Sequence, residues 1–99
     1  MAGKIPISFA ASAVSDMESI QAYYDNEGVP ATGKSLMAEL LLEIERLADY
    51  PKSGRIVPEF NIEHLREIIH PPFRIVYRYD KKRVRIVRIW RSERILKLP

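Results

Sequence analysis

The sequence predicts one small α+β domain, with an N-terminal strand and an antiparallel helix hairpin followed by a three-stranded antiparallel meander. Three observations lead to this prediction. Apolar residues recur at helical spacing through the first half of the chain, they alternate with charged residues through the second half, and turn-forming residues separate the segments. With 99 residues and no repeat or linker, residues 1–99 are expected to form a single domain around one core.

The first elements are a short strand and a helix. Residues 4–9, KIPISF, alternate as a strand does, and Pro6 favours the edge of a sheet because proline has no backbone N–H to donate. Four apolar side chains then form one stripe of a helix: Ala13, Met17, Ile20 and Tyr24. Ser12 is the expected N-cap, and residues 26–28, Asn-Glu-Gly, end this helix.

A second helix is expected from about Pro30–Thr32 to Tyr50. Its apolar residues are strongly periodic: Leu36, Met37, Leu40, Leu41, Ile44, Leu47 and Ala48. Five of them are read as core: Leu36, Leu40, Leu41, Ile44 and Leu47. Pro51 and Gly54 end it. Because the link at residues 29–32 is short, the two helices are expected to lie antiparallel.

The second half of the chain reads as a loop and three strands. The loop covers residues 52–61, and the strands cover residues 65–70, 73–79 and 83–90. Pro71-Pro72 and a tight turn at residues 80–82 connect the strands, which gives an antiparallel meander. We expect the helix pair to cover one face of this sheet.

Strand alternation divides the meander into an apolar and an arginine-rich face. Phe73, Ile75, Tyr77 and Tyr79 share one face, and Arg74, Val76 and Arg78 share the other. In the last strand the alternation slips at Ile86-Val87, where a β-bulge would keep Arg83, Arg85 and Arg88 on the arginine side. Trp90 lies on that side if the bulge is present and in the core if it is absent. The arginine-rich face is expected to be concave and open until a partner covers it.

The charge is distributed unevenly along the chain. Residues 1–50 hold three basic and eight acidic residues, a net charge of −5, and residues 51–99 hold thirteen basic and five acidic residues, a net charge of +8; together they give +3. This indicates a basic surface that binds a polyanion or an acidic protein segment. A solubilising surface is the alternative.

Several classes of protein are excluded or disfavoured by composition. No apolar run reaches the roughly 20 residues of a membrane helix, so no membrane span is expected. The start of the chain is too broken by Pro6 to resemble a secretory signal, and the absence of cysteine excludes disulfides and cysteine-ligated zinc. A cytoplasmic location fits these features.

Motifs along nearly the whole chain form a specific set when they are taken together and in this order: Ala13-xx-Asp16-Met17-xx-Ile20-xx-Tyr23, Leu47-Ala48-xx-Pro51, Gly54-Arg55-Ile56-Val57-Pro58-Glu59, Leu65-Arg66-Glu67-Ile68, Phe73-Arg74-Ile75-Val76-Tyr77-Arg78 and Ile86-Val87-Arg88-Ile89-Trp90-Arg91-xx-Arg94. This set resembles the RelE/ParE superfamily of bacterial type II toxins. The resemblance implies a β-α-α-β-β-β toxin domain over residues 1–99. It also implies growth inhibition, a role in plasmid stabilisation, and a cognate antitoxin that folds onto the toxin in a hetero-oligomer.

The resemblance leaves the target open between two branches of the superfamily. RelE-like members cleave mRNA in the translating ribosome without a metal or cofactor, and ParE-like members poison DNA gyrase. A degenerate, non-toxic binding module is a third possibility. We therefore expect no metal and no cofactor in any of these cases.

A nuclease of this kind would use Arg74 to hold the phosphate and Glu59 as the general base. The alternative for Arg74 is a salt bridge to Glu67 or Glu59. The general acid is missing, because the segment where nuclease members place His or Tyr reads Arg-Ser-Glu-Arg at residues 91–94, and arginine does not release its proton. Tyr77 and Tyr79 face the covered side of the sheet, and His64 and His70 read as ordinary loop histidines.

The missing acid favours the ParE-like, gyrase-directed function over the RelE-like endonuclease. Residues expected to contact the antitoxin or the target are Arg55, Arg66, Arg74, Arg78, Arg85, Arg88, Trp90, Arg91 and Arg94. Antitoxin binding is expected to place acidic and apolar side chains against the arginine-rich face.

Overall fold

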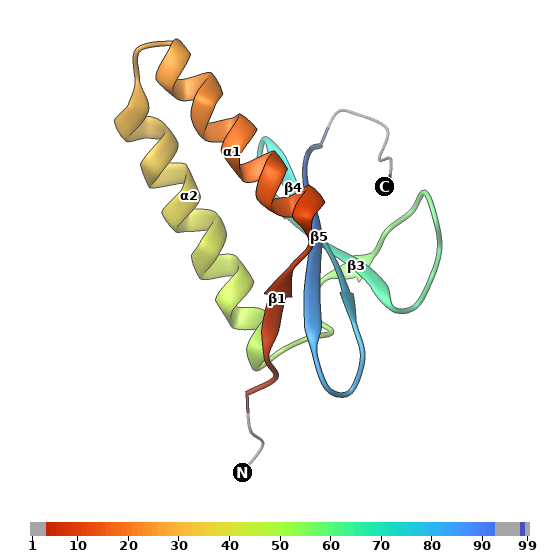
Figure 1. The fold of residues 1–99 in the computed structure, drawn as a ribbon. Helices are drawn as coiled ribbons and strands as arrows, with labels where there is room; N and C mark the ends of the chain where they lie inside the picture. Colours follow the sequence, from red (N-terminus) through yellow and green to blue (C-terminus); the bar gives the residue numbers. More distant parts are fainter. Residues whose placement is uncertain (1–3, 93–97, 99) are drawn as a thin grey trace.

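The computed structural model describes residues 4–92 and Leu98 and has the predicted α+β fold (Figure 1). In chain order the elements are β1 (Ile7–Phe9), α1 (Ala11–Asn26), α2 (Pro30–Glu45), the 3-10 helix η1 (Arg46–Ala48), β2 (Arg55–Ile56), β3 (Leu65–His70), β4 (Phe73–Tyr79) and β5 (Val84–Arg91). The sheet order is β1-β5-β4-β3-β2. β1 runs parallel to β5, and the other neighbouring pairs are antiparallel.

The two helices form the predicted hairpin on one face of the sheet (Figure 1). Gly28, with φ +78°, follows the end of α1 in the left-handed conformation that glycine adopts without strain. Pro30 begins α2, where its missing N–H costs no helical hydrogen bond. None of the helices in residues 4–92 is long and apolar enough to cross a membrane.

The prediction that Ser12 caps α1 is wrong. The N-cap is Ala10, which offers no side-chain hydrogen bond to the first turn. The Ser12 hydroxyl instead donates to the Val87 carbonyl at 2.6 Å and so ties α1 to β5.

The main core lies between the helix hairpin and the sheet. Its buried members on the helices and η1 are Ala13, Ile20, Leu40, Ile44 and Leu47, and its members on the sheet are Phe73, Ile75, Tyr77, Tyr79, Val84, Ile86 and Ile89. The helical and alternating patterns predicted from the sequence therefore converge on one face, which we call the helix-covered face.

The two edge strands are shorter than the central strands. β1 contains residues 7–9 rather than the expected 4–9, and it lies at the sheet edge as Pro6 predicted. β2 was not predicted, because its two residues are too few to show alternation; they pair with Arg66 and Glu67 of β3.

The predicted β-bulge is present at the centre of β5. Val76 pairs with Arg88 and Tyr77 pairs with Ile86, which leaves Val87 as the extra residue. Because cross-strand partners share a face, the bulge puts Arg88 on the side opposite the helices. We call this side the second face.

The second face is not as open as the sequence suggested. A smaller core of Val57, Leu65, Val76 and Val87 covers its centre, and Ala10, Trp90 and Leu98 pack against it. The segment between β2 and β3 returns over the sheet, with the Val57 N–H donating to the Leu65 carbonyl at 3.1 Å. The expectation of a wholly exposed arginine face is therefore wrong.

Candidate functional site

The second face brings together four of the five arginines that the alternation assigned to it, and the fifth, Arg83, lies just before β5. Arg78 lies opposite Arg85, Val76 opposite Arg88, and Arg74 opposite Trp90. The bulge thus also places Trp90 on this face, as its presence predicted. The four arginines nevertheless differ sharply in burial and in the charges around them.

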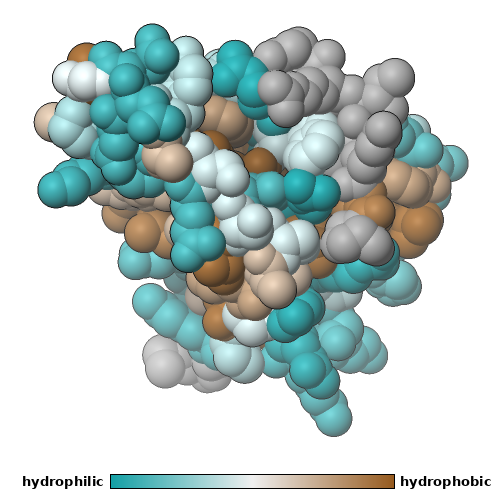
Figure 2. Space-filling view, turned by 45° about the horizontal axis from the view of Figure 1, so that its top comes forward, coloured by the Kyte–Doolittle hydropathy of each residue, from teal (hydrophilic) through white to brown (hydrophobic). Residues whose placement is uncertain are grey.

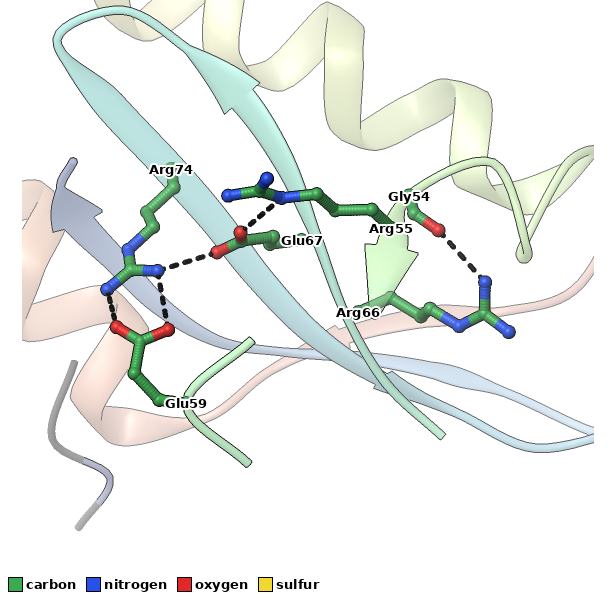
Figure 3. Close-up of polar contacts among 6 residues, drawn as sticks. All are labelled: Gly54, Arg55, Glu59, Arg66, Glu67 and Arg74. Atoms are coloured by element: carbon green, nitrogen blue, oxygen red, sulfur yellow. Dashed lines mark hydrogen bonds and ion pairs between the residues drawn. The ribbon is translucent and has the colours of Figure 1, made fainter. Parts of the chain in front are cut away.

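Arg74 lies at the centre of an ionic network in which Arg74 and Glu67 are buried (Figure 3). Its guanidinium donates to both carboxylate oxygens of Glu59 and, at 3.0 Å, to Glu67. The Arg74 side chain is 5% exposed and that of Glu67 is fully buried. The hydrogen bonds to Glu59 raise the pKa of Arg74, while burial acts to lower it, so the guanidinium stays charged.

Glu67 joins Arg74 to the edge strand. One of its oxygens accepts from Arg74, and the other accepts from Arg55 Nε at 2.7 Å. Arg55 is largely exposed beyond this contact, with 60% of its side chain accessible. The predicted alternative for Arg74, a salt bridge to Glu67 or Glu59, is therefore present with both carboxylates.

Arg88 is held by a helix carboxylate. Its Nε and Nη2 donate to the two oxygens of Asp16 at 2.8 and 2.7 Å. The guanidinium carbon also lies 4.1 Å from the centre of the Trp90 ring, a cation–π distance. The sequence did not predict this partner for Asp16, and its one signal was a carboxylate beside the apolar stripe of α1.

Arg66 and Arg91 lie on the helix-covered face, because they pair with Tyr77 and Phe73. Arg66 donates to the Gly54 carbonyl at 3.1 Å and pairs with Glu63 at 2.7 Å. Arg91 stacks near the Phe73 ring at 5.6 Å. Arg94, also predicted to bind a partner, lies outside the described residues.

Arg78 and Arg85 are exposed on the second face. Among the residues the structure describes, no carboxylate forms an ion pair with either one. Arg85 Nη1 donates to the Ser8 Oγ of β1 at 3.4 Å. The predicted arginine surface is thus reduced to this pair and its neighbours.

The tyrosines that could supply a proton are turned away from Arg74. Tyr77 is buried on the helix-covered face, where its hydroxyl donates to the Pro51 carbonyl at 2.8 Å and accepts from the Gly54 N–H at 2.9 Å. Desolvation raises the pKa of Tyr77, although the Gly54 hydrogen bond opposes this. A Cβ at Gly54 would come within 2.7 Å of the Tyr77 hydroxyl, so the close approach requires glycine.

The two histidines contact residues other than Arg74. His70 pairs with Phe73, which puts it on the helix-covered face, and its Nε2 lies 3.0 Å from a Glu39 oxygen of α2. His64 contacts the edge of the Tyr79 ring, with centroids 6.0 Å apart. Within the described ranges, no three His, Asp or Glu side chains are grouped to hold a metal ion.

Comparisons with known proteins agree with this fold. A family model described as "ParE toxin of type II toxin-antitoxin system, parDE" matches residues 7–96. The chromosomal ParDE system from P. aeruginosa has a similar structure, with a TM-score of 0.75, 18% identity, and coverage of 91% of this chain and 98% of that one. No curated protein sequence matches significantly.

A second solved structure has the same fold. It is the toxin–antitoxin complex RelBE2 from Mycobacterium tuberculosis, with a TM-score of 0.64 and 16% identity, covering 90% of this chain and 99% of that one. At such low identity, both structural matches report a shared fold.

Proposed function

Since the chain belongs to the ParE toxin family of type II toxin–antitoxin systems, we propose that it inhibits growth by acting on DNA gyrase and that a cognate antitoxin neutralises it. The alternative within the superfamily is the RelE-like mRNA endonuclease. The observation that favours gyrase over mRNA is the ion pair between Arg74 and Glu59, the two residues that a nuclease would need.

Arg74 and Glu59 each engage the polar atoms that the other would need in order to act on a substrate. Both oxygens of Glu59 accept from the Arg74 guanidinium, so they are not presented to a substrate hydroxyl. Arg74 also faces the buried Glu67, and a phosphate placed there would meet two carboxylates. The arrangement suits a structural clamp between β4 and the segment that precedes β3.

The positions of the residues that could act as a general acid also favour gyrase over mRNA as the target. A general acid must lie within hydrogen-bond reach of the leaving oxygen. Tyr77 and His70 both lie on the face opposite Arg74. No phosphate held at Arg74 could accept a proton from either residue through the intervening sheet.

We place the antitoxin on the exposed apolar side chains rather than on the centre of the second face. Arg74 and Arg88 already have carboxylate partners, whereas a hollow of about 390 Å³ between α1 and the sheet is lined by Tyr23, Trp90 and Arg91 among others. Apolar side chains lie among hydrophilic ones on the face seen in Figure 2. An apolar and acidic antitoxin segment would bury aromatic rings there and stabilise the toxin by mass action.

The target is tested with purified protein. The chain is incubated with DNA gyrase, ATP and relaxed plasmid, and supercoiling and DNA cleavage are measured. We expect loss of supercoiling and accumulation of cleaved plasmid. If the antitoxin is added before the toxin, gyrase should continue to supercoil the plasmid.

The rival functions give different results in cells that express the chain alone. New 5′ ends within codons, mapped by primer extension on a translated message, together with normal supercoiling would replace the gyrase proposal with the nuclease. Unimpaired growth at confirmed expression would instead indicate a non-toxic binding module.

A further inference from the structure

We propose that Arg78, Arg83 and Arg85, at the turn end of the β4–β5 hairpin, bind the phosphodiester backbone of a nucleic acid. The hairpin projects from the body of the sheet at the bottom of Figure 1. The inference goes beyond the proposed function, because such binding requires neither gyrase nor antitoxin.

The first observation is a pair of like charges held face to face. Arg78 of β4 and Arg85 of β5 are direct cross-strand partners, so their side chains leave the same face of the sheet as neighbours. Like charges in this position destabilise a sheet. Within residues 4–92, neither guanidinium has a carboxylate in ion-pair contact. An anion bound between them would remove the repulsion.

The rest of the second face shows that the chain neutralises arginines elsewhere. Arg74 has Glu59 and Glu67, and Arg88 has Asp16. The positive charge at the hairpin is therefore a local feature of this end of the sheet and does not extend over the whole face.

The second observation is a pocket at the same place. It has a volume of about 320 Å³ and is lined by His64, Arg78, Tyr79, Asp80, Arg83 and Arg85. This brings three guanidinium groups around one open space. The exposed Lys81 and Lys82 add two further charges at the adjoining turn.

Asp80, the one carboxylate that lines this pocket in the part of the chain that the structure describes, accepts hydrogen bonds from the backbone. One oxygen accepts from the Lys82 and Arg83 N–H groups at 2.7 and 2.9 Å, which closes the turn. The Lys82 hydrogen bond in particular lowers the pKa of Asp80. The other oxygen lies 3.9 Å from Arg83 Nε. This single carboxylate leaves most of the positive charge of the three arginines uncompensated.

The composition of the patch favours phosphates over an acidic peptide. Peptide interfaces depend on buried apolar and aromatic anchors. Within residues 4–92, the large exposed apolar residues all lie elsewhere: Val14, Tyr23, Val29, Leu41, Leu42, Tyr50, Phe60, Ile62 and Ile69. A guanidinium group can donate two parallel hydrogen bonds to the oxygens of one phosphate. A nucleic acid presents phosphates at regular spacing.

The experiment measures binding of the full chain to fluorescein-labelled 20-base-pair DNA, and to single-stranded RNA of the same length, by anisotropy over a range of salt concentrations. The test variant is Arg78→Gln/Arg85→Gln. The control is Lys34→Gln/Lys52→Gln, which removes the same charge from two exposed lysines outside the hairpin. Circular dichroism and thermal unfolding check that both variants are folded.

We expect the wild-type chain to bind in a salt-dependent manner, and the arginine variant to bind at least about tenfold more weakly. Its slope of log affinity against log salt on duplex DNA should be smaller by about 2, since each neutralised phosphate contributes about 0.9. The control should retain most of the affinity. The polymer that binds more tightly, DNA or RNA, identifies the source of the phosphates.

Three results would overturn the inference. The first is a wild-type chain that binds neither polymer at low salt. The second is equal weakening by the arginine variant and the lysine control, which would indicate net charge alone. The third is that a 20-residue peptide rich in both acidic and apolar residues binds more tightly than either nucleic acid, and that the arginine variant loses this binding.

Discussion

Asp16 of α1 holds Arg88 of β5 through two hydrogen bonds, although the residues are 72 positions apart. The same carboxylate accepts the backbone N–H of Ile89 at 3.0 Å. Beyond the end of β1, Asp16 and Ser12 thus supply partners to the edge of β5 that a neighbouring strand would otherwise provide. The Asp16 side chain thereby fixes the position of α1 against the bulged strand β5.

The first prediction concerns this link. Asp16→Asn removes the negative charge but keeps an acceptor, and we expect it to lower the free energy of unfolding by about 2 kcal/mol, since hydrogen bonds to charged groups are strong. Urea denaturation measures the change. Asp25→Asn, at an exposed site on the same helix, should change stability by less than about 0.5 kcal/mol. Equal effects of the two variants would mean that the Asp16 contact contributes nothing special.

The second prediction concerns the buried network. Arg74→Met leaves Glu67 buried with Arg55 as its remaining partner, and we expect a loss of about 3 kcal/mol because an uncompensated buried charge is costly. Thermal and urea unfolding measure it. The matched control is Arg78→Met on the same strand and face, which should cost less than about 0.5 kcal/mol. If both variants are equally stable, the network is not structural.

The third prediction is a dependence on alkaline pH. Burial holds the pKa of Tyr77 above its value in the unfolded chain, so the folded state binds this proton more tightly. That contribution is complete below pH 10 and is lost as the pH rises through the folded pKa. Tyr77→Phe abolishes the titration, and the stability advantage of the wild type over Tyr77→Phe should therefore shrink between pH 9 and pH 12.

The control for this experiment is the exposed Tyr50. Tyr50→Phe removes a tyrosine hydroxyl outside the core and should change the free energy of unfolding by less than about 0.5 kcal/mol. A constant difference between the wild type and Tyr77→Phe, measured by thermal unfolding, would show that ionisation of Tyr77 is not linked to folding.

The sequence predicted most of the fold because its apolar spacing was strong and local. The period of the two helices was sufficient to predict the helix hairpin, and the slip at Ile86-Val87 indicated a bulge that would put Arg88 on the second face. The sequence left Trp90 open between the core and that face, and its pairing with Arg74 puts it on the second face. β2 was missed because two residues carry no period. The Ser12 cap failed because a long-range acceptor, the Val87 carbonyl, competes for the hydroxyl.

The candidate site was harder to predict than the fold. Alternation assigns a strand side chain to a face, but it does not tell which distant segment will cover that face. Glu59 reaches Arg74 only because the segment before β3 folds back over the sheet. For that reason the sequence placed Arg74 and Arg78 together, while the structure separates a buried, paired arginine from an exposed one.

The structural role of Glu59 is tested most directly by growth after induction of Glu59→Gln without antitoxin. The substitution keeps an acceptor for Arg74, and Glu67 still pairs with it, so the variant should fold. If Glu59 is a structural partner and not a catalytic base, the variant arrests growth and inhibits gyrase as the wild type does. Normal growth with undiminished soluble, folded protein would contradict the account and assign Glu59 a catalytic role.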